Sequence, residues 1–281
     1  MTDNIASRAM LVTLTISQAT FRKLDKTATA EVTTTHAAAS DAGRFNKQIV
    51  DKAALLPITQ IAGAARTYLY QHTLPWADNG DRALSSLNYF EVMTKLREFK
   101  AQFDAEVDKF CTEYVQHRER ARLRLNSLFK DEDYPQEWEV RNKFAMNFGV
   151  MPLPVAGDFR VDMGEDVVAE VRQEIEAQLN ARVQGMVAEV WGELTTTVSH
   201  LRDRLQSGGK LHDSALDNIT DLLDRLPGLN ITNDAGIEQM RAEIRRTLGG
   251  LEMKDIKKDE KLKQSVIDKT NDILGQMRGL M

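Results

Sequence analysis

Apolar residues and threonines alternate near the start of the chain. In the stretch RAMLVTLTIS, Val12, Leu14 and Ile16 are separated by Thr13 and Thr15. A period of two places the three apolar side chains on one face of an extended backbone. The pattern therefore predicts a strand with one buried face.

The following segment mixes helix and strand signals. Ser17 is a suitable N-cap for a short helix, and the alternating, threonine-rich residues 27–36 predict a second strand. Residues 40–56 predict a helix, and Pro57 suits the first turn of the helix after it. Together these signals predict a small α/β element over residues 1–84.

A regular stripe of apolar residues begins after this element. Its members recur in steps of three and four, as in the contact stripe of a coiled coil. The stripe contains Tyr89, Met93, Leu96, Phe103, Val107, Phe110, Tyr114, Ala121 and Leu128. Lys100, His117 and Arg124 interrupt it. We expect one helix over residues 85–129, roughly 65 Å long at about 1.5 Å per residue.

A second helical stripe runs from Val168 to Leu205 and ends before Gly208-Gly209. Because the two predicted helices have similar lengths, they predict an antiparallel hairpin. The segment 129–164 between them would form an inserted tip. Within that tip, FAMNFGVMPLP predicts a strand that its prolines confine to the edge of a sheet.

These patterns predict an α+β fold that is mainly helical. The expected parts are an N-terminal α/β element at 1–84, a long coiled-coil-like helical hairpin at 85–207 with a strand-bearing tip at 129–164, and a C-terminal helical segment at 208–281. The C-terminal segment contains three shorter amphipathic patterns, of which the last covers residues 254–277.

Composition narrows the function classes. Of the 281 residues 42% are hydrophobic and 28% are charged, with a net charge of −5, so a nucleic-acid contact needs a local basic patch. The single cysteine, Cys111, excludes an intramolecular disulfide framework, and we expect a small buried hydrophobe there. No apolar run approaches the roughly 20 residues of a membrane span, and MTDNIASRAM does not resemble a signal peptide. We expect a soluble, cytoplasmic protein.

The most basic stretch is HRERARLRL at residues 117–125. Its arginines are Arg118, Arg120, Arg122 and Arg124. On a helix they flank the apolar stripe on both sides, where the expected hairpin would bring the acidic start of the second helix. The acids there are Glu165, Asp166, Glu170, Glu174 and Glu176. We expect cross-helix ion pairs worth about 0–1 kcal/mol each, and a phosphate-binding patch is the alternative.

A second basic cluster lies at the start of the last predicted helix. It contains Lys254, Lys257, Lys258, Lys261 and Lys263, with acidic residues interleaved. A solvated helix face accounts for such a mixture, and a docking or nucleic-acid surface is the alternative.

Two loops carry residue types that support chemistry in other proteins. HTLPWADNGDRAL contains Trp76, Asp78, Asp81 and Arg82, and PLPVAGDFRVD contains Asp158 and Arg160. Carboxylates beside arginine can form an acid/base or phosphate site. In the alternative, the tryptophan fills the core and the acids brace turns. The hairpin would place the two loops about 65 Å apart, which argues against an enzyme.

Common catalytic and cofactor motifs are missing from the sequence. It contains no G-x-x-x-x-G-K-[ST], H-E-x-x-H, G-x-S-x-G or G-x-G-x-x-G. The five histidines show no metal-ligand spacing. We therefore assign no catalytic, cofactor-binding or metal-binding residue.

The order of the motifs resembles a known family. TLPW-x-D-N-G-x-R-x-L at 73–84, a long helical stripe, PLPVAGDFRVD at 152–162 and a second long stripe are similar to an uncharacterised family encoded by bacteriophages and plasmids. The resemblance covers about residues 8–206. Some members are encoded near MoxR-type AAA+ ATPases or near proteins resembling the cobaltochelatase subunit with a von Willebrand domain. The resemblance implies that the protein comes from a mobile element, is located in the cytoplasm of a bacterial host and has an AAA+ ATPase as partner. It supplies no catalytic residues.

Two functions remain from these observations. The first is a non-enzymatic, oligomer-forming interaction or scaffold protein that assembles through the interrupted stripe between Lys100 and Leu128. The second is a DNA-binding accessory protein, in single-strand annealing or replication, that uses the two basic clusters. Aromatic residues for base stacking are sparse near both clusters, which disfavours single-strand binding.

Overall fold

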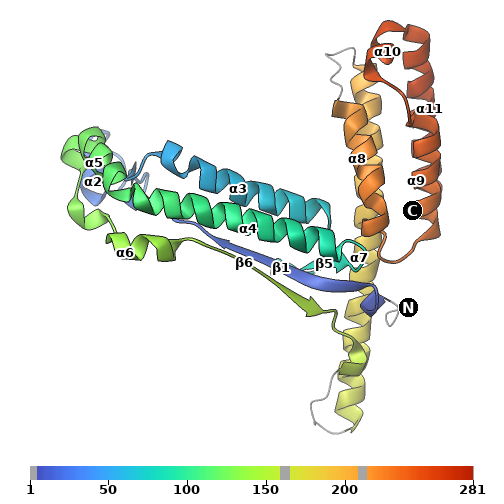
Figure 1. Cartoon of the computed structure of the whole chain (residues 1–281), viewed down its shortest axis with the longest axis horizontal. Coiled ribbons are helices and arrows are strands. Elements are labelled where there is room, and N and C mark those ends of the chain that lie inside the picture. Colours follow the sequence, from blue (N-terminus) through green and yellow to red (C-terminus); the bar gives the residue numbers. More distant parts are fainter. Residues whose placement is uncertain (1–4, 159–164, 208–213, 281) are drawn as a thin grey trace. The chain divides into compact units, whose positions relative to one another are not determined.

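The computed structural model describes residues 5–158, 165–207 and 214–280, apart from the side chains of Asp158 and Glu165. The fold is α+β and mainly helical, as predicted (Figure 1). The longer helices are α2 Lys26–Thr35, α3 Lys52–Gln71, α4 Tyr89–Thr112, α5 Tyr114–Leu125, α7 Glu165–Gln206, α8 Ser214–Leu229, α9 Ala235–Leu248 and α11 Glu260–Leu280. The short helices are α6 Glu137–Val140, α10 Met253–Lys258, η1 Asn126–Leu128, η2 Asp131–Asp133, η3 Arg141–Lys143 and η4 Ala156–Asp158.

The strands form two small sheets. They are β1 Ala9–Ser17, β2 Arg22–Leu24, β3 Asn46–Gln48, β4 Leu74–Pro75, β5 Arg82–Ser85 and β6 Ala145–Pro152. The first sheet has the order β4-β5-β1-β6, and β5 pairs antiparallel with both β1 and β4. The second sheet is the antiparallel pair β2-β3. Strand β1 confirms the alternating pattern at the start of the chain, and β6 confirms the predicted edge strand.

The chain divides into two compact units, each built from separated segments. Unit 1 comprises Met1–Thr13, Leu69–Val92 and Gly149–Met281, as far as these are described, and unit 2 comprises Leu14–Tyr68 and Met93–Phe148. Unit 1 therefore combines parts of all three consecutive segments expected from the sequence, and unit 2 combines parts of the first two. Each has its own apolar core.

Three predictions in the first sixty residues are wrong. Residues 27–35 lie in helix α2 rather than in a strand, and His36 is the C-cap of that helix. Asp25 caps the start of the helix by accepting a bond from the Ala28 amide at 3.1 Å. The hydroxyls of Thr29 and Thr33 bond to carbonyls in the preceding turn, which satisfies their polar groups inside a helix.

The other two errors concern β2 and β3. The segment after Ser17 forms β2 rather than a short helix, and residues 40–56 contain β3 before α3 begins at Lys52. The two strands pair so that Lys47 becomes buried beside Asp25 at an ion-pair distance of 2.9 Å. This long-range contact stabilises strands here, although the local sequence favours a helix.

The first long apolar stripe forms most of the predicted helix. It is divided at Glu113 into α4 and α5, although the backbone bonds from Glu113 N–H to the Lys109 carbonyl and from His117 N–H to the Glu113 carbonyl continue through the junction. Phe103 and Tyr114 are buried in the core of unit 2. The stripe between Lys100 and Leu128 is therefore largely covered within its own unit, and the expectation that it provides the assembly surface is wrong. Helix α5 ends at Leu125, before η1.

The second long stripe forms α7, and α7 takes part in an antiparallel helical hairpin. Its hairpin partner is α8 rather than the predicted helix at 85–129, which lies largely in unit 2. The direction is visible in the side chains, because Arg225 near the end of α8 pairs with Glu193 of α7 at 3.4 Å. Helix α11 also packs along α7. The physical reason is the amount of apolar surface on α8, α9 and α11, which together bury the C-terminal half of the α7 stripe.

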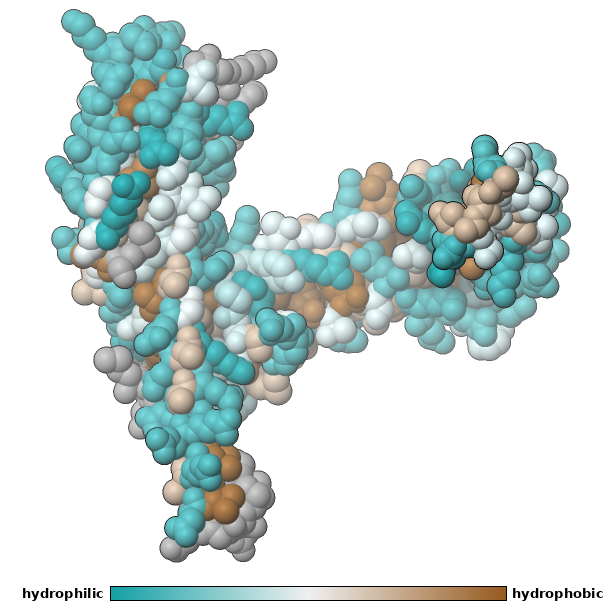
Figure 2. All heavy atoms as spheres, turned by 180° about the vertical axis from the view of Figure 1, so that it is seen from behind, coloured by the Kyte–Doolittle hydropathy of each residue, from teal (hydrophilic) through white to brown (hydrophobic). Residues whose placement is uncertain are grey.

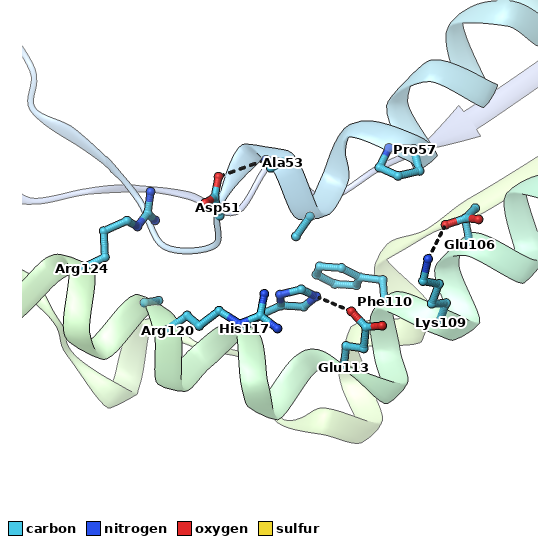
Figure 3. Close-up of a pocket in the computed structure, with 12 residues that line it drawn as sticks. Asp51, Ala53, Pro57, Glu106, Lys109, Phe110, Glu113, His117, Arg120 and Arg124 are labelled. Carbon is cyan, nitrogen blue, oxygen red and sulfur yellow. Dashed lines mark hydrogen bonds and ion pairs between the residues drawn. The ribbon is translucent and has the colours of Figure 1, made fainter.

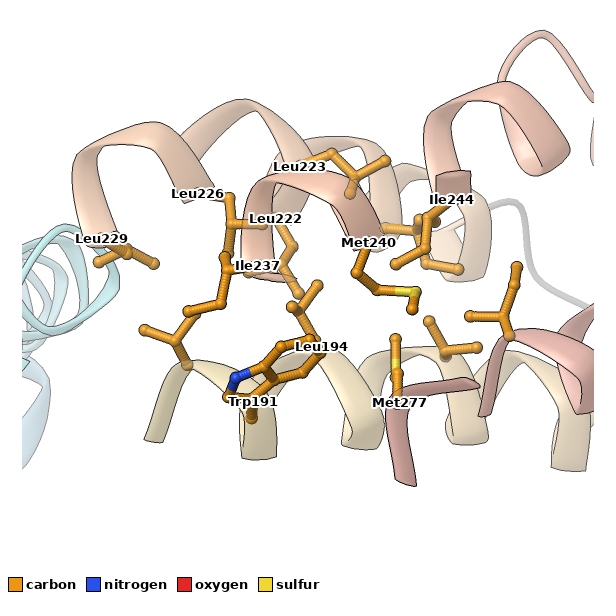
Figure 4. Packing of buried hydrophobic residues seen from close by; sticks show 14 of the residues in the cluster. Trp191, Leu194, Leu222, Leu223, Leu226, Leu229, Ile237, Met240, Ile244 and Met277 are labelled. Carbon is orange, nitrogen blue, oxygen red and sulfur yellow. The ribbon is translucent and has the colours of Figure 1, made fainter. Parts of the chain in front are cut away.

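Unit 1 has a helical core built on this hairpin (Figure 4). Trp191 and Leu194 of α7 lie opposite Leu226 of α8, and Ile237 of α9 and Met277 of α11 complete the packing. The last predicted helix is interrupted at Asp259, which caps α11 by accepting bonds from the Lys261 and Leu262 amides. Four helices therefore follow residue 213 in the described part of the chain, where three were expected.

Close packing within unit 1 leaves no room for a side chain at Gly228. A Cβ atom there would lie 1.9 Å from Nδ2 of Asn88, whereas a Cβ at Gly275 of α11 would meet nothing within 4 Å. We expect Gly228→Ala to displace the Asn88 side chain and to lower the free energy of unfolding by up to about 1 kcal/mol. Gly275→Ala, the matched control, should leave stability unchanged or raise it by up to about 1 kcal/mol. Urea denaturation of both variants measures the difference, and equal stabilities would contradict the packing argument.

Candidate interaction surface

Two of the four clustered arginines hold a loop of unit 2. Nη2 of Arg118 and Nη2 of Arg122 donate to the same Oδ1 of Asp131, at 2.7 and 3.1 Å. Their guanidinium groups also lie over the rings of Tyr134 and Phe129, at 5.8 and 4.4 Å from the ring centres. The expectation that these arginines pair with the acidic start of α7 is therefore wrong for both. Asp131 lies only a few residues beyond α5. Closing the short loop to Asp131 therefore costs less entropy than a contact with the distant start of α7 would.

The other two arginines keep most of their hydrogen-bonding capacity. Arg120 donates to Gln116 at 3.5 Å, and Arg124 donates to the main-chain carbonyl of Gln48. Among the described residues, neither has a carboxylate oxygen within 4.0 Å. They lie four residues apart on α5, so their side chains extend from the same face of the helix.

Arg120 and Arg124 line a groove of about 320 Å³ between the start of α3 and the α4–α5 junction (Figure 3). The remaining lining residues are Asp51, Ala53, Ala54, Pro57, Glu106, Lys109, Phe110, Glu113, His117 and Ala121. Asp51 accepts a bond from the Ala53 amide, which occupies an N–H group at the start of α3. The unpaired positive charge of the groove therefore comes from the two arginines rather than from the helix terminus.

His117 forms part of the groove wall. Its ring is 7% exposed and stacks on Phe110, with ring centres 5.2 Å apart, and Nε2 lies 3.6 Å from Oε2 of Glu113. Burial lowers the pKa of His117 and Arg120 lowers it further, whereas Glu113 and Asp51 act in the opposite direction. The residue interrupts the apolar stripe, as noted from the sequence, yet it packs as an aromatic ring.

The lowered pKa of His117 predicts a pH dependence of stability. Because the folded state binds this proton less readily than the unfolded state does, the free energy of unfolding should fall as pH drops below the ordinary histidine value of 6.5. We expect His117→Gln to reduce that fall, while the same change at the exposed His36 leaves it intact. Urea denaturation above and below pH 6.5 measures both, and identical pH profiles for the His117 variant and the unmodified chain would contradict the assignment.

The loop at residues 73–84 is braced by bonds among its own polar residues and by contacts with Thr13 and Tyr70. Asp81 accepts bonds from Thr13 Oγ1 at 2.6 Å and from Asn79 Nδ2 at 2.9 Å. Arg82 donates from Nε to Thr73 Oγ1 at 2.6 Å and lies over the Tyr70 ring. These bonds match the structural alternative, in which the charged residues brace the turn.

The second candidate loop lies beside the first, contrary to the expected separation of about 65 Å. Trp76 is 6% exposed and lines a small apolar pocket with Leu153 and Pro154, all within unit 1. The prediction failed because it depended on the wrong hairpin partner. Asp78 is exposed on the turn. The side chain of Asp158 and the whole of Arg160 lie outside the described residues.

The lysines near the C-terminus are divided between two helices. Lys254, Lys257 and Lys258 lie on α10, and Lys261 and Lys263 lie on α11. Lys254 pairs with Glu252, and Lys263 pairs with Glu260 at 3.1 Å. Acids interleave with the lysines in space as they do in the sequence, which is typical of a solvated face.

The first third of α7 is an acidic surface that sequence reasoning treated only as a partner for α5. None of the residues 166–178, all of them described, is buried, although the apolar stripe continues through them. Val167 is 45% exposed, and Glu170 and Glu174 extend from the same side of the helix. Figure 1 shows these turns continuing past the ends of α8 and α11, and Figure 2 shows hydrophobic residues exposed among hydrophilic ones at this lower end of α7.

The described residues provide neither a metal-ion cluster nor a membrane-spanning helix. These residues contain no group of three or more His, Cys, Asp or Glu side chains placed to hold a metal ion. No helix among them is long and apolar enough to cross a membrane. Cys111 is half-buried against the core of unit 2, and burial raises the pKa of its thiol.

Comparisons with known proteins add no relative. No protein-family model matches the chain, and no curated protein or solved structure matches it.

Proposed function

We propose that this chain is a non-enzymatic, oligomer-forming interaction protein. The observation that carries the proposal is the first third of α7, whose apolar stripe continues beyond α8 and α11 and is left half-buried at Val168, Val171 and Ile175. A helix stripe of this kind is stable in water when a further surface covers it. The hydrogen bonds of Asp81 with Thr13 and of Arg82 with Thr73 brace the structure around the turn, which supports a binding role over a catalytic one.

The first test is the mass of the purified full-length chain as a function of its concentration. Light scattering after size exclusion should give a mass above that of one chain, rising with concentration. A single-chain mass at every concentration would overturn self-assembly. Val167→Ala tests this surface with a small change in side-chain size. Val32→Ala, at a similarly exposed position of α2, is its control.

We include an AAA+ ATPase as a partner in this proposal only because of the family resemblance over residues 8–206. A purified MoxR-type ATPase supplied with ATP is the direct probe. Retention of that ATPase on the immobilised chain would support a motor partner in a phage or plasmid system. Absence of retention in the presence and absence of ATP would remove that partner while leaving self-assembly intact.

Nucleic-acid binding is a second candidate, favoured by the guanidinium groups of Arg120 and Arg124, which have no carboxylate oxygen within 4.0 Å in the described part of the chain. Fluorescence anisotropy of labelled single- and double-stranded oligonucleotides tests it at low and high salt. Binding that weakens steeply with salt would reveal phosphate contacts through counterion release. The pairing of Arg118 and Arg122 with Asp131 leaves fewer charges for phosphate than the sequence suggested, so we rank this function second.

A further inference from the structure

We infer that the arginine face of α5 in one copy of the chain binds the acidic start of α7 in a second copy. The inference rests on the proposed self-assembly and names the two surfaces that meet. Arg120 and Arg124 belong to the first surface, and Glu170 and Glu174 belong to the second.

The spacing of the charges supports this pairing. Each pair is separated by four residues of one helix, so each places two like charges about 6 Å apart along the helix axis, at about 1.5 Å per residue. Two helices that pack side by side can therefore bring both glutamates against both arginines at once. Two ion pairs between the helices fix the relative direction and position of those helices better than a single ion pair does.

The charges of both surfaces are available. Arg120 and Arg124 have no carboxylate within 4.0 Å among the described residues. Glu170 and Glu174 form no ion pair with another described residue, and Glu174 accepts only a 3.5 Å bond from Gln178. By contrast, Arg118 and Arg122 already share Asp131 and are left out of the contact.

Apolar residues accompany the charges on both helices. Leu123 is 78% exposed beside Arg120 and Arg124, and Val167 is 45% exposed beside Glu170 and Glu174. Contact between them would remove apolar surface from water at the centre of the charged contacts. The groove next to Arg120 and Arg124 gives the longer side chains of the second copy a place to enter (Figure 3).

A second copy fits this surface better than two α7 helices pairing with each other. Such a pair would bring the glutamates of one copy against those of the other, which is repulsive. The contact between α5 and α7 instead joins opposite charges, and every copy carries both surfaces. The same two surfaces can therefore close a dimer by meeting twice, or continue into a larger assembly.

Charge reversal with mixing tests the inference in full-length protein. One variant carries Arg120→Glu and Arg124→Glu, and the other carries Glu170→Arg and Glu174→Arg. Each alone should self-associate at least about a hundredfold more weakly than the unmodified chain, because like charges then face each other. An equimolar mixture should recover the assembly, since the acidic α5 of the first variant meets the basic α7 of the second, and the two unmodified surfaces also meet.

The control is Arg97→Glu with Lys143→Glu, which changes the net charge by the same amount as the first variant, at two exposed residues of unit 2. It should assemble like the unmodified chain. Far-ultraviolet circular dichroism of each variant shows whether the helices have formed, and the mixture remains informative because recovery requires folded partners. Assembly that persists in both reversed variants, or a mixture that fails to recover it, would overturn the inference. A chain that is a single copy at all concentrations would instead overturn the proposed self-assembly.

Discussion

Replacing Lys47 by Met is expected to lower the free energy of unfolding of unit 2 by about 3 kcal/mol. The side chain of Lys47 is 2% exposed, and its Nζ lies 2.9 Å from Asp25 and 2.7 Å from Asp133. Nζ also donates to the Leu128 carbonyl at 2.7 Å. Removing the ammonium leaves two carboxylates with little access to water and without the cation that bonds to both, which is costlier than the loss of the attraction itself.

The measurement is urea denaturation combined with hydrogen exchange, which locates the loss in unit 2. Lys23→Met is the matched control, because Lys23 lies directly opposite Lys47 in the β2-β3 pair and is exposed. That control should change stability by less than about 0.5 kcal/mol. A similar effect of both substitutions would show that the buried ion pairs do not hold the strands, α2 and the loop after α5 together.

The same cluster gives unit 2 an acid sensitivity. Bonds from the Lys47 side chain and the Ala28 amide lower the pKa of Asp25 below its ordinary value of 3.8. The stabilisation is therefore present above that value and is lost as pH falls through the lower pKa of the folded state. Lys47→Met should reduce this loss, since the bond that contributes most to the lowered pKa is then missing.

Replacing Leu226 by Ala is expected to lower the free energy of unfolding of unit 1 by about 3 kcal/mol, within the usual range of about 2–5. Leu226 is fully buried on α8 and faces the core that α7 and α9 share (Figure 4). The substitution removes apolar contacts and leaves a cavity that the rigid helices cannot fill by moving.

Leu87→Ala provides the control for this substitution. Leu87 also belongs to unit 1, but 77% of its surface is exposed, so the same chemical change should cost less than about 0.5 kcal/mol. Urea denaturation followed by tryptophan fluorescence is suited to the measurement, because Trp191 lies in the affected core. Equal losses for Leu226→Ala and Leu87→Ala would contradict the assignment of Leu226 to the core.

Periodic patterns in the sequence predicted the elements whose burial repeats regularly. Strand β1, the α4–α5 segment and α7 each follow a period of two or of three and four, and each was predicted within a few residues. The errors at α2 and β3 have a different origin. There the decisive contacts are the Asp25 cap and the ion pair of Lys47 with Asp133, 86 positions away, which no local pattern reveals.

An apolar stripe predicts that a helix face will be covered, but it does not identify the covering element. For α7 the nearest candidate in length was the α4–α5 segment, whereas α8 and α11 provide the cover. The arginines show the same limit at short range. The sequence KDED at 130–133 directly follows the basic stretch, and it was the available signal that Arg118 and Arg122 would be neutralised by Asp131.

The interleaving of the two units along the chain sets the order in which they can fold during synthesis. Every segment of unit 2 has left the ribosome once residue 148 has emerged, so its core can close while the rest is still being made. Unit 1 has to wait, because its first segment, Met1–Thr13, shares a core with helices that end near residue 280. The apolar face of α7 is therefore covered in steps, first by α8 and α9 and completely only when α11 has emerged.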